Sequence, residues 1–288
     1  MNEERHKRSA CPCCDSPELT DHYYKTLKCQ KCGHAWFPEE LIKIEPSELY
    51  GESYFQGNEY PDYLGDEESL KLNFRKYCKK IIKVNSKGSK LLEIGCAYGF
   101  FLDVAKNYFD VMGVDVSEDV IKKARDRHLN VICADFAKHP PKLPPLDIIC
   151  LWDTIEHLLH PLDYLKMANQ KLNKGGHLFL TTSDVSSFLA KVQGSNWRQY
   201  HPPTHVHYFS RKSLKMALEK AGFKTQKISV LSQWHSLKHI LGAFRIHGRT
   251  SFSRKTAKFL EKLCPKLLNK FSFPVPTTDI LWVHGIKM

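Results

Sequence analysis

The chain has 288 residues, of which 42% are hydrophobic, and its formal net charge is +12. This length fits one main domain with a small appendage, and the apolar content is enough for a packed core, which excludes a wholly disordered chain. Residues 1–8 are rich in charge and no apolar run reaches membrane-spanning length. We therefore expect a cytoplasmic protein without a signal peptide or a transmembrane segment.

The ten cysteines fall into two groups. Five lie within residues 11–32, and the others are scattered, several of them in apolar runs. This distribution predicts one metal site and a set of buried thiols, and it argues against a disulfide framework.

Two C-x-x-C pairs, Cys11 with Cys14 and Cys29 with Cys32, are separated by 14 residues. Four thiolates in two such turns suit one tetrahedral Zn(II). We expect a zinc-ribbon-like module over residues 1–45, with a strand over residues 23–28, that depends on the metal because it has too few apolar residues for its own core. Cys13 is an alternative ligand, and a redox pair or free thiols are the alternative to zinc.

The ribbon has two candidate roles, binding nucleic acid or packing on the rest of the chain. Over residues 11–36 the charges balance: Lys25, Lys28 and Lys31 against Asp15, Glu18 and Asp21. A neutral ribbon is a poor phosphate binder. We therefore expect it to pack on the main domain or to shape the substrate entrance.

Residues 46–87 are predicted to be a linker and a helical lid. Residues 46–65 are dense in aromatic and acidic side chains, and apolar residues at helical spacing indicate a helix over residues 66–84. Tyr54 and Phe55 are the candidate lid residues, and core packing beneath a linker is the alternative.

Residues 91–101 carry the most specific pattern in the chain. An apolar strand containing Glu93 leads into a turn with Gly95, Ala97 and Gly99, and a helix follows. Small residues let a ligand approach the backbone, and a helix N-terminus offers free N–H groups. A second strand ends in Asp115, where a carboxylate is placed to accept hydrogen bonds from ribose hydroxyls. The pattern predicts a nucleoside-binding crevice.

A dinucleotide is not the expected ligand. Ala97 and Phe100 replace the second and third glycines of G-x-G-x-x-G, and Glu93 repels phosphate but suits a cationic ligand. The stretch resembles motif I, [E/D]-x-G-x-G-x-G, of the class I S-adenosylmethionine-dependent methyltransferases. Further strand-like runs follow in the order typical of that family, at residues 130–135, 146–153, 175–182, 224–231 and 280–286.

The resemblance implies an α/β fold, with a doubly wound seven-stranded sheet and helices on both faces, over residues 88–288. It also implies that S-adenosylmethionine is the cofactor. The residues that would bind it are Glu93, Gly95, Ala97, Gly99, Asp115, Val116, Asp135, Phe136 and Trp152.

Glu156 and His157 follow the fourth strand and resemble the post-strand Glu-His motif of ubiquinone-biosynthesis-like small-molecule methyltransferases. The resemblance implies that His157 is a general base and that Glu156 orients its imidazole or binds a substrate hydroxyl. The alternative is that His157 packs against or caps a helix. The segment from His205 to Ser210 resembles the same family and implies that His205 lies near the acceptor. Ser210 is the expected N-cap of the next helix.

A second metal site at His201, His205 and His207 is not expected, because the nearby sequence has no Cys, Asp or Glu to complete it. The insert at residues 233–272 carries nine Lys and Arg residues against Glu261 alone, and we expect it to be helical. It has three interpretations: a helix on an anionic membrane surface, a lid over an anionic substrate, or a helix packed on the domain with a solvated basic face.

The sequence therefore predicts a methyltransferase that acts on a small molecule. A sugar or glycan precursor is the suggested acceptor, because the zinc-plus-methyltransferase arrangement is similar to sugar C-methyltransferases, although those carry a further C-terminal domain. Two alternatives stay open: an RNA methyltransferase that uses the ribbon as reader, and a noncatalytic binding protein. The acceptor atom and the oligomeric state are not determined by the sequence.

Overall fold

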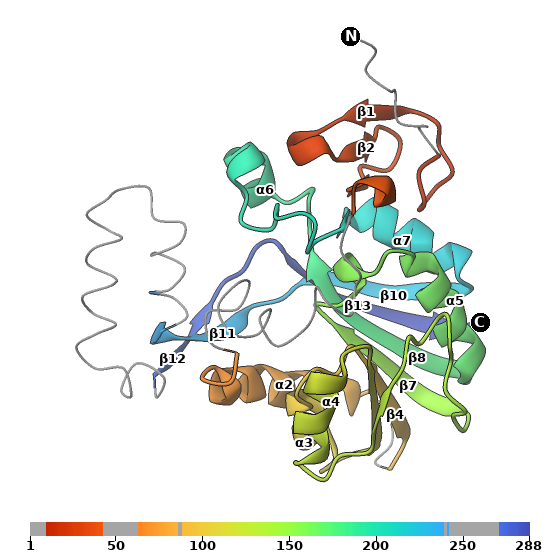
Figure 1. Ribbon diagram of the computed structural model, residues 1–288, viewed down its shortest axis with the longest axis vertical. Coiled ribbons are helices and arrows are strands. Elements are labelled where there is room, and N and C mark those ends of the chain that lie inside the picture. Colours follow the sequence, from red (N-terminus) through yellow and green to blue (C-terminus); the bar gives the residue numbers. More distant parts are fainter. Residues whose placement is uncertain (1–9, 43–62, 86–87, 239–240, 242–270) are drawn as a thin grey trace. The chain divides into compact units, whose positions relative to one another are not determined.

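A computed structural model of the chain describes residues 10–42, 63–85, 88–238, 241 and 271–288 (Figure 1). The chain forms two compact units. Unit 1 comprises residues 1–43, 136–231 and 278–288, and unit 2 comprises residues 44–135 and 232–277.

Unit 2 contains three parallel strands in the order β4-β5-β6, with helices connecting them. Its elements are α2 (Glu67–Ile81), β4 (Lys90–Ile94), α3 (Phe100–Ala105), β5 (Asp110–Asp115), α4 (Glu118–Arg125), β6 (Val131–Cys133), β11 (Gln233–Ser236) and β12 (Ser272–Val275). Phe74 of α2 packs edge-on against Phe101 of α3, with ring centroids 5.5 Å apart. The helix predicted over residues 66–84 is confirmed as α2, and it is packed into the core of its unit.

Unit 1 contains the other four strands of the seven-stranded main sheet, in the order β10-β13-β8-β7. These are β7 (Leu146–Trp152), β8 (Leu172–Ser183), β10 (Phe223–Val230) and β13 (Ile280–Lys287). Strands β7 and β8 are parallel, whereas β13 runs antiparallel to both β8 and β10. Figure 1 shows β8, β13 and β10 side by side in green and blue. The predicted α/β fold with seven strands is confirmed.

Two of the described helices of unit 1 begin at serine caps, and a third begins at a proline. They are α5 (Pro161–Lys171), α6 (Phe188–Gln193) and α7 (Arg211–Lys220), with short 3₁₀ turns η4 (Ile155–His157) and η5 (Gly194–Asn196). Ser210 caps α7 as predicted, and its hydroxyl and that of Ser213 form a reciprocal capping box. Pro161 occupies the first turn of α5, where a missing N–H costs nothing.

The N-terminal segment forms a small antiparallel sheet in the order β1-β2-β3-β9. Its strands are β1 (Leu19–Asp21), β2 (Leu27–Cys29), β3 (Ala35–Trp36) and β9 (His207–Tyr208), and η2 (Glu39–Leu41) follows β3. The predicted strand over residues 23–28 is only partly correct, because residues 23–25 form a 3₁₀ turn, η1 (Tyr23–Lys25). Tyr24 and Lys25 take positive φ angles of 54° and 63°, which a strand does not allow.

The basic insert begins and ends in strands that the sequence pattern did not indicate. β11 and β12 pair antiparallel, with Gln233 opposite Val275 and Ser236 opposite Ser272. Residues 260–270 of the insert, which were expected to be helical, and the lid residues Tyr54 and Phe55 lie outside the described residues. Within the described part of the chain, no helix has both the length and the apolar character needed to cross a membrane.

Candidate functional site

The predicted cofactor turn joins β4 to α3 in unit 2. Gly95, Ala97 and Gly99 all have positive φ angles, of 76°, 44° and 74°. Glycine adopts this conformation without steric cost, whereas Ala97 is held in it against its preference. A Cβ atom added at Gly99 would lie 2.3 Å from Cδ1 of Leu129. The turn therefore brings bare backbone to the end of the strand, and Gly99 has no room for a side chain.

Asp115, at the end of β5, ties this turn to the next one. Its Oδ2 atom accepts the N–H of Ala97 at 3.0 Å, and its Oδ1 atom accepts the N–H of Ser117 at 3.0 Å. Burial raises the pKa of Asp115, and these backbone hydrogen bonds oppose the rise. The carboxylate that was predicted to receive ribose hydroxyls thus also fixes the shape of the turn, a role that the sequence analysis missed.

Glu93 is a buried carboxyl group beside the turn. It is 3% exposed, and its Oε2 atom has no hydrogen-bond partner among the described residues. Burial, together with the negative charge of Asp115, raises the pKa of Glu93 well above its ordinary value. A buried carboxyl oxygen without a partner costs free energy unless a ligand satisfies it. Glu93 therefore fits a cationic or amino-bearing ligand such as the methionine part of S-adenosylmethionine.

The remaining predicted cofactor residues are divided between the units. Val116 and Asp135 belong to unit 2, where the Val116 carbonyl contacts the Cys133 thiol at 3.5 Å. Phe136 and Trp152 belong to unit 1. There, Phe136 is 1% exposed, and the Trp152 ring stacks on Trp282 with centroids 5.3 Å apart.

Glu156, His157 and His205 come together in unit 1. Glu156 and His157 lie on η4, just after β7, and His205 lies just before β9. The Val206 N–H donates to the Glu156 carbonyl at 2.9 Å, which holds the two segments side by side. The rings of His157 and His205 meet edge to face with centroids 4.6 Å apart. The structure thus brings together three predicted catalytic residues that span 49 positions of sequence, from Glu156 to His205.

Backbone carbonyls set the tautomers of both histidines. Nδ1 of His157 lies 2.8 Å from the Thr204 carbonyl, and Nδ1 of His205 lies 3.0 Å from the Gln199 carbonyl. A carbonyl oxygen only accepts, so each Nδ1 carries a proton and each Nε2 carries the lone pair. The Thr204 carbonyl therefore orients the imidazole of His157, and the orienting role of Glu156 stays a prediction.

Glu156 is the least solvated member of the group. It is 3% exposed, and its Oε2 atom has no hydrogen-bond partner among the described residues. Burial and the negative charge of Asp153 raise its pKa to about 8. One ligand atom from each of Glu156, His157 and His205 lies within 4.8 Å of the others. This cluster brings a buried carboxyl group and two basic ring nitrogens to one point.

The four predicted zinc ligands also come together. Sγ of Cys11 lies 3.5 Å from that of Cys32, and Sγ of Cys14 lies 3.6 Å from that of Cys29. A tetrahedral zinc ion with Zn–S bonds of about 2.3 Å separates its sulfurs by about 3.8 Å. Cys13 is buried but is not part of the group of four. The four thiols fit zinc in both chemistry and spacing.

The two C-x-x-C turns have the same backbone geometry. The Asp15 N–H donates to the Cys11 carbonyl at 2.8 Å, and the Gly33 N–H donates to the Cys29 carbonyl at 2.9 Å. Asp15 and Gly33 both have positive φ angles, of 55° and 76°. Each turn therefore has a residue in the left-handed region after its second cysteine, aspartate in one turn and glycine in the other.

The ribbon is joined to the segment that carries His205. Strand β3 pairs with β9, and the Phe37 N–H donates to the Val206 carbonyl at 2.8 Å. Because the Leu159 carbonyl lies 3.2 Å from Nε2 of His207, that nitrogen is the donor, and Nδ1 of His207 accepts from Nε2 of His34 at 3.0 Å. These contacts support the prediction that the ribbon packs on another part of the chain, here the segment that carries His205.

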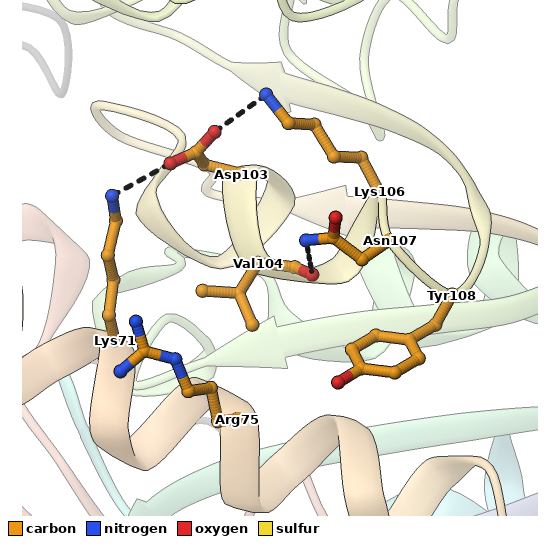
Figure 2. Close-up of a pocket in the computed structure, with 7 residues that line it drawn as sticks. All are labelled: Lys71, Arg75, Asp103, Val104, Lys106, Asn107 and Tyr108. Atoms are coloured by element: carbon orange, nitrogen blue, oxygen red, sulfur yellow. Dashed lines mark hydrogen bonds and ion pairs between the residues drawn. The ribbon is translucent and has the colours of Figure 1, made fainter.

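A polar hollow of about 350 Å³ lies between α2 and α3 in unit 2 (Figure 2). Asp103 sits between two lysines there, with its oxygens 2.7 Å from Nζ of Lys71 and 2.7 Å from Nζ of Lys106. The sequence analysis did not indicate this hollow. Its central charges are paired with one another, so they stabilise the contact between the two helices.

A family described as "Methyltransferase domain" matches residues 69–228. A ubiquinone biosynthesis O-methyltransferase of Aliivibrio fischeri is 27% identical over 169 residues, which cover 52% of this chain and 72% of that protein. A tRNA U34 carboxymethyltransferase of Proteus mirabilis is 26% identical over 155 residues, which cover 49% of this chain and 47% of that protein.

Among solved structures, the chain is similar to a SAM-dependent methyltransferase of Thermotoga maritima. The TM-score is 0.53 at 22% sequence identity, and the match covers 82% of this chain and 99% of the other. At this identity the likeness establishes the fold alone.

Proposed function

Since the chain belongs to the class I S-adenosylmethionine-dependent methyltransferases, we propose that it transfers the methyl group to a hydroxyl oxygen of a small-molecule acceptor. The carbon–sulfur bond of the cofactor breaks while a carbon–oxygen bond forms, and the sulfur keeps the electron pair. The acceptor hydroxyl must lose its proton during this displacement. The enzyme therefore needs a proton acceptor on the acceptor side.

The observation that carries this proposal is the cluster of Glu156, His157 and His205. His157 presents a basic Nε2 atom, because its Nδ1 proton is held by the Thr204 carbonyl. The side chain of His157 is partly exposed, whereas Glu156 and His205 are buried. An acceptor arriving from solvent therefore meets His157 first, and Nε2 of His157 is the candidate base. The O-methyltransferase relatives favour oxygen as the acceptor atom.

The cofactor-binding side of the proposal rests on unit 2. Glu93, Gly95, Ala97, Gly99 and Asp115 are the candidate residues there. The buried, partnerless oxygen of Glu93 and the bare backbone at Gly99 suit the amino acid part of the cofactor. Asp115 keeps further lone pairs on both oxygens for the ribose hydroxyls. The cofactor contacts expected from Phe136 and Trp152, which belong to unit 1, stay predictions.

We assign the ribbon a structural role. Zn(II) bound by Cys11, Cys14, Cys29 and Cys32 would stabilise the small sheet, and that sheet holds the segment from His205 to Ser210 through β9. Ser210 donates its hydroxyl to the Cys32 carbonyl at 2.6 Å, so the second cysteine turn also contacts the start of α7.

The proposal is tested with radiolabelled S-adenosylmethionine and a host-cell extract, fractionated into nuclease-sensitive polymer, lipid and water-soluble small molecules. Label in the small-molecule or lipid fraction supports the proposal, and alkaline stability of the labelled product would identify an ether rather than an ester. Label in nuclease-sensitive polymer overturns it and favours the RNA alternative, for which the tRNA-modifying relative is the motive. A sugar or glycan precursor is one acceptor that the small-molecule fraction would reveal.

A further inference from the structure

Three side chains in unit 1 have the arrangement of a metal site rather than of an isolated base. One ligand atom from each of Glu156, His157 and His205 lies within 4.8 Å of the other two. The four thiols of the ribbon meet the same limit. Small side-chain rotations bring atoms at this spacing to a common ion about 2.1 Å from each.

The hydrogen bonds around the two histidines point to the same conclusion. Each ring donates its Nδ1 proton to a backbone carbonyl, that of Thr204 for His157 and that of Gln199 for His205. This is the outer contact that metal-binding histidines usually make, because it fixes the tautomer and leaves Nε2 as the ligand. Both histidines therefore present Nε2 as a ligand atom. Their ring centroids lie 4.6 Å apart, which is close enough for both rings to bind one ion.

The third ligand is the carboxyl group of Glu156. Oε2 of Glu156 is buried and has no hydrogen-bond partner among the described residues. A buried carboxylate oxygen without a partner is costly, and a cation is the strongest partner that it can have. Asp153 adds a second negative charge nearby, which a cation would also offset.

From these three observations we propose that Glu156, His157 and His205 form a second metal site, separate from the cysteine site, for a divalent transition metal ion. Two imidazoles and one carboxylate are the ligand set used for catalytic zinc and for non-haem iron(II), and imidazole disfavours magnesium and calcium. Three protein ligands leave open positions on the ion. The partly exposed side of His157 gives those positions access to solvent.

The role of this ion rests on the proposed function. An ion in this position lowers the pKa of an acceptor hydroxyl that reaches it and orients the oxygen for in-line attack. The role of His157 as a ligand would replace its role as the candidate base, while the transfer of the methyl group to oxygen stays the same. The hydroxyl proton then passes to solvent. The acceptor is then expected to carry an ionisable hydroxyl group.

The experiment is a cobalt(II) titration of the full-length protein without cofactor or acceptor. Cobalt held by four thiolates absorbs strongly in both the near ultraviolet and the visible, whereas cobalt held by imidazole and carboxylate absorbs only in the visible, and weakly. The second site is therefore read from the visible component that remains after the spectrum of the thiolate site is subtracted, together with the number of cobalt ions bound. We expect the wild-type protein to bind cobalt at both. Glu156→Gln and His157→Asn should lose the visible component and keep the thiolate band, which reports that the cysteine site is intact.

His160→Asn is the matched control, since His160 lies three residues from His157 and faces Glu39 at 3.6 Å. It should keep both components. The inference is overturned if the wild type binds cobalt at thiolates alone, or if Glu156→Gln and His157→Asn both keep the visible component. Because no methyl transfer is measured, a failure here leaves the proposed function standing, and absence of transfer would leave the metal site standing.

Discussion

The backbone N–H of Val206 donates to the carbonyl of Glu156 at 2.9 Å. The carbonyl of Val206 in turn accepts the N–H of Phe37 at 2.8 Å. One residue therefore connects the ribbon to the turn that carries Glu156 and His157. The chain of His34, His207 and the Leu159 carbonyl makes a second connection. The ribbon is thus part of the support of the candidate acceptor site.

This connection predicts that loss of the cysteine site slows methyl transfer but leaves the affinity for the cofactor unchanged. Cys29→Ser removes one of the four thiols, so zinc affinity should fall steeply and the small sheet should loosen. We expect methyl transfer to fall by at least about tenfold, the effect of losing an outer support of a reactive group. Affinity for S-adenosylmethionine, measured by calorimetry, should stay the same because the candidate cofactor turn belongs to unit 2.

Cys13→Ser is the control for this variant, since Cys13 is equally buried but stands outside the group of four. It should retain zinc, determined by elemental analysis, and should retain activity. Full activity in zinc-free Cys29→Ser would contradict the supporting role of the ribbon.

The turn at Gly99 gives a second prediction. Gly99→Ala places a Cβ atom at φ +74° and 2.3 Å from Cδ1 of Leu129. A left-handed alanine costs about 1–2 kcal/mol, and the collision adds about 1–3 kcal/mol. Denaturant unfolding should therefore show a loss of about 2–5 kcal/mol in the free energy of unfolding. Cofactor affinity should fall as well, because Leu129 or the turn must move.

Gly88→Ala separates the two contributions. Gly88 also has a positive φ, of +80°, but an added Cβ would meet nothing within 4 Å. It should show the left-handed cost alone, with normal cofactor affinity. Equal losses in the two variants would mean that the space around Gly99 is not limiting.

The sequence predicted the features that depend on local pattern. The strand, turn and helix around Gly95 were predictable because glycine at positive φ and an apolar strand have short-range signatures. The C-x-x-C pairs and the Ser210 cap were predictable for the same reason. In the structure the four thiols come together, and Ser210 forms a capping box.

The features that the sequence did not predict depend on contacts between distant residues. Nothing in the dipeptide His207-Tyr208 indicates a strand, and it becomes one only because β3 supplies a pairing edge. The orienting partner of His157 is a backbone carbonyl, that of Thr204, and any residue type has one. A pattern of side chains carries no information about such a partner. The same reason explains why β11 and β12 were missed.

Asp115 provides a third prediction. Asp115→Ala removes the acceptor of the Ala97 and Ser117 N–H groups, together with the proposed ribose contact. The affinity for S-adenosylmethionine should fall by about 1–3 kcal/mol, the cost of losing charged hydrogen bonds. Isothermal titration is the measurement. Asp110→Ala is the control, because Asp110 lies on the same strand but is exposed, and it should bind normally. Unchanged affinity in Asp115→Ala would exclude Asp115 from the cofactor site.

The pair of His177 and His284 predicts the dependence of stability on pH. Their rings stack on adjacent strands β8 and β13, with Nδ1 of His177 2.8 Å from Nε2 of His284. Burial lowers the pKa of His284 from 6.5 to about 4, with a smaller contribution from the charge of His177, and burial also lowers the pKa of His177. Between these pH values the unfolded chain binds more protons than the native one. The free energy of unfolding should therefore decrease as the pH falls from 6.5 towards 4.

His284→Gln should make that decrease shallower, because it removes one histidine whose pKa is lowered in the native state. The measurement is a series of denaturant unfolding curves across this pH range, compared with His139→Gln, which changes an exposed histidine. The control should follow the wild-type slope. If His284→Gln follows it too, the buried histidine pair does not contribute to acid sensitivity, and other groups must account for it.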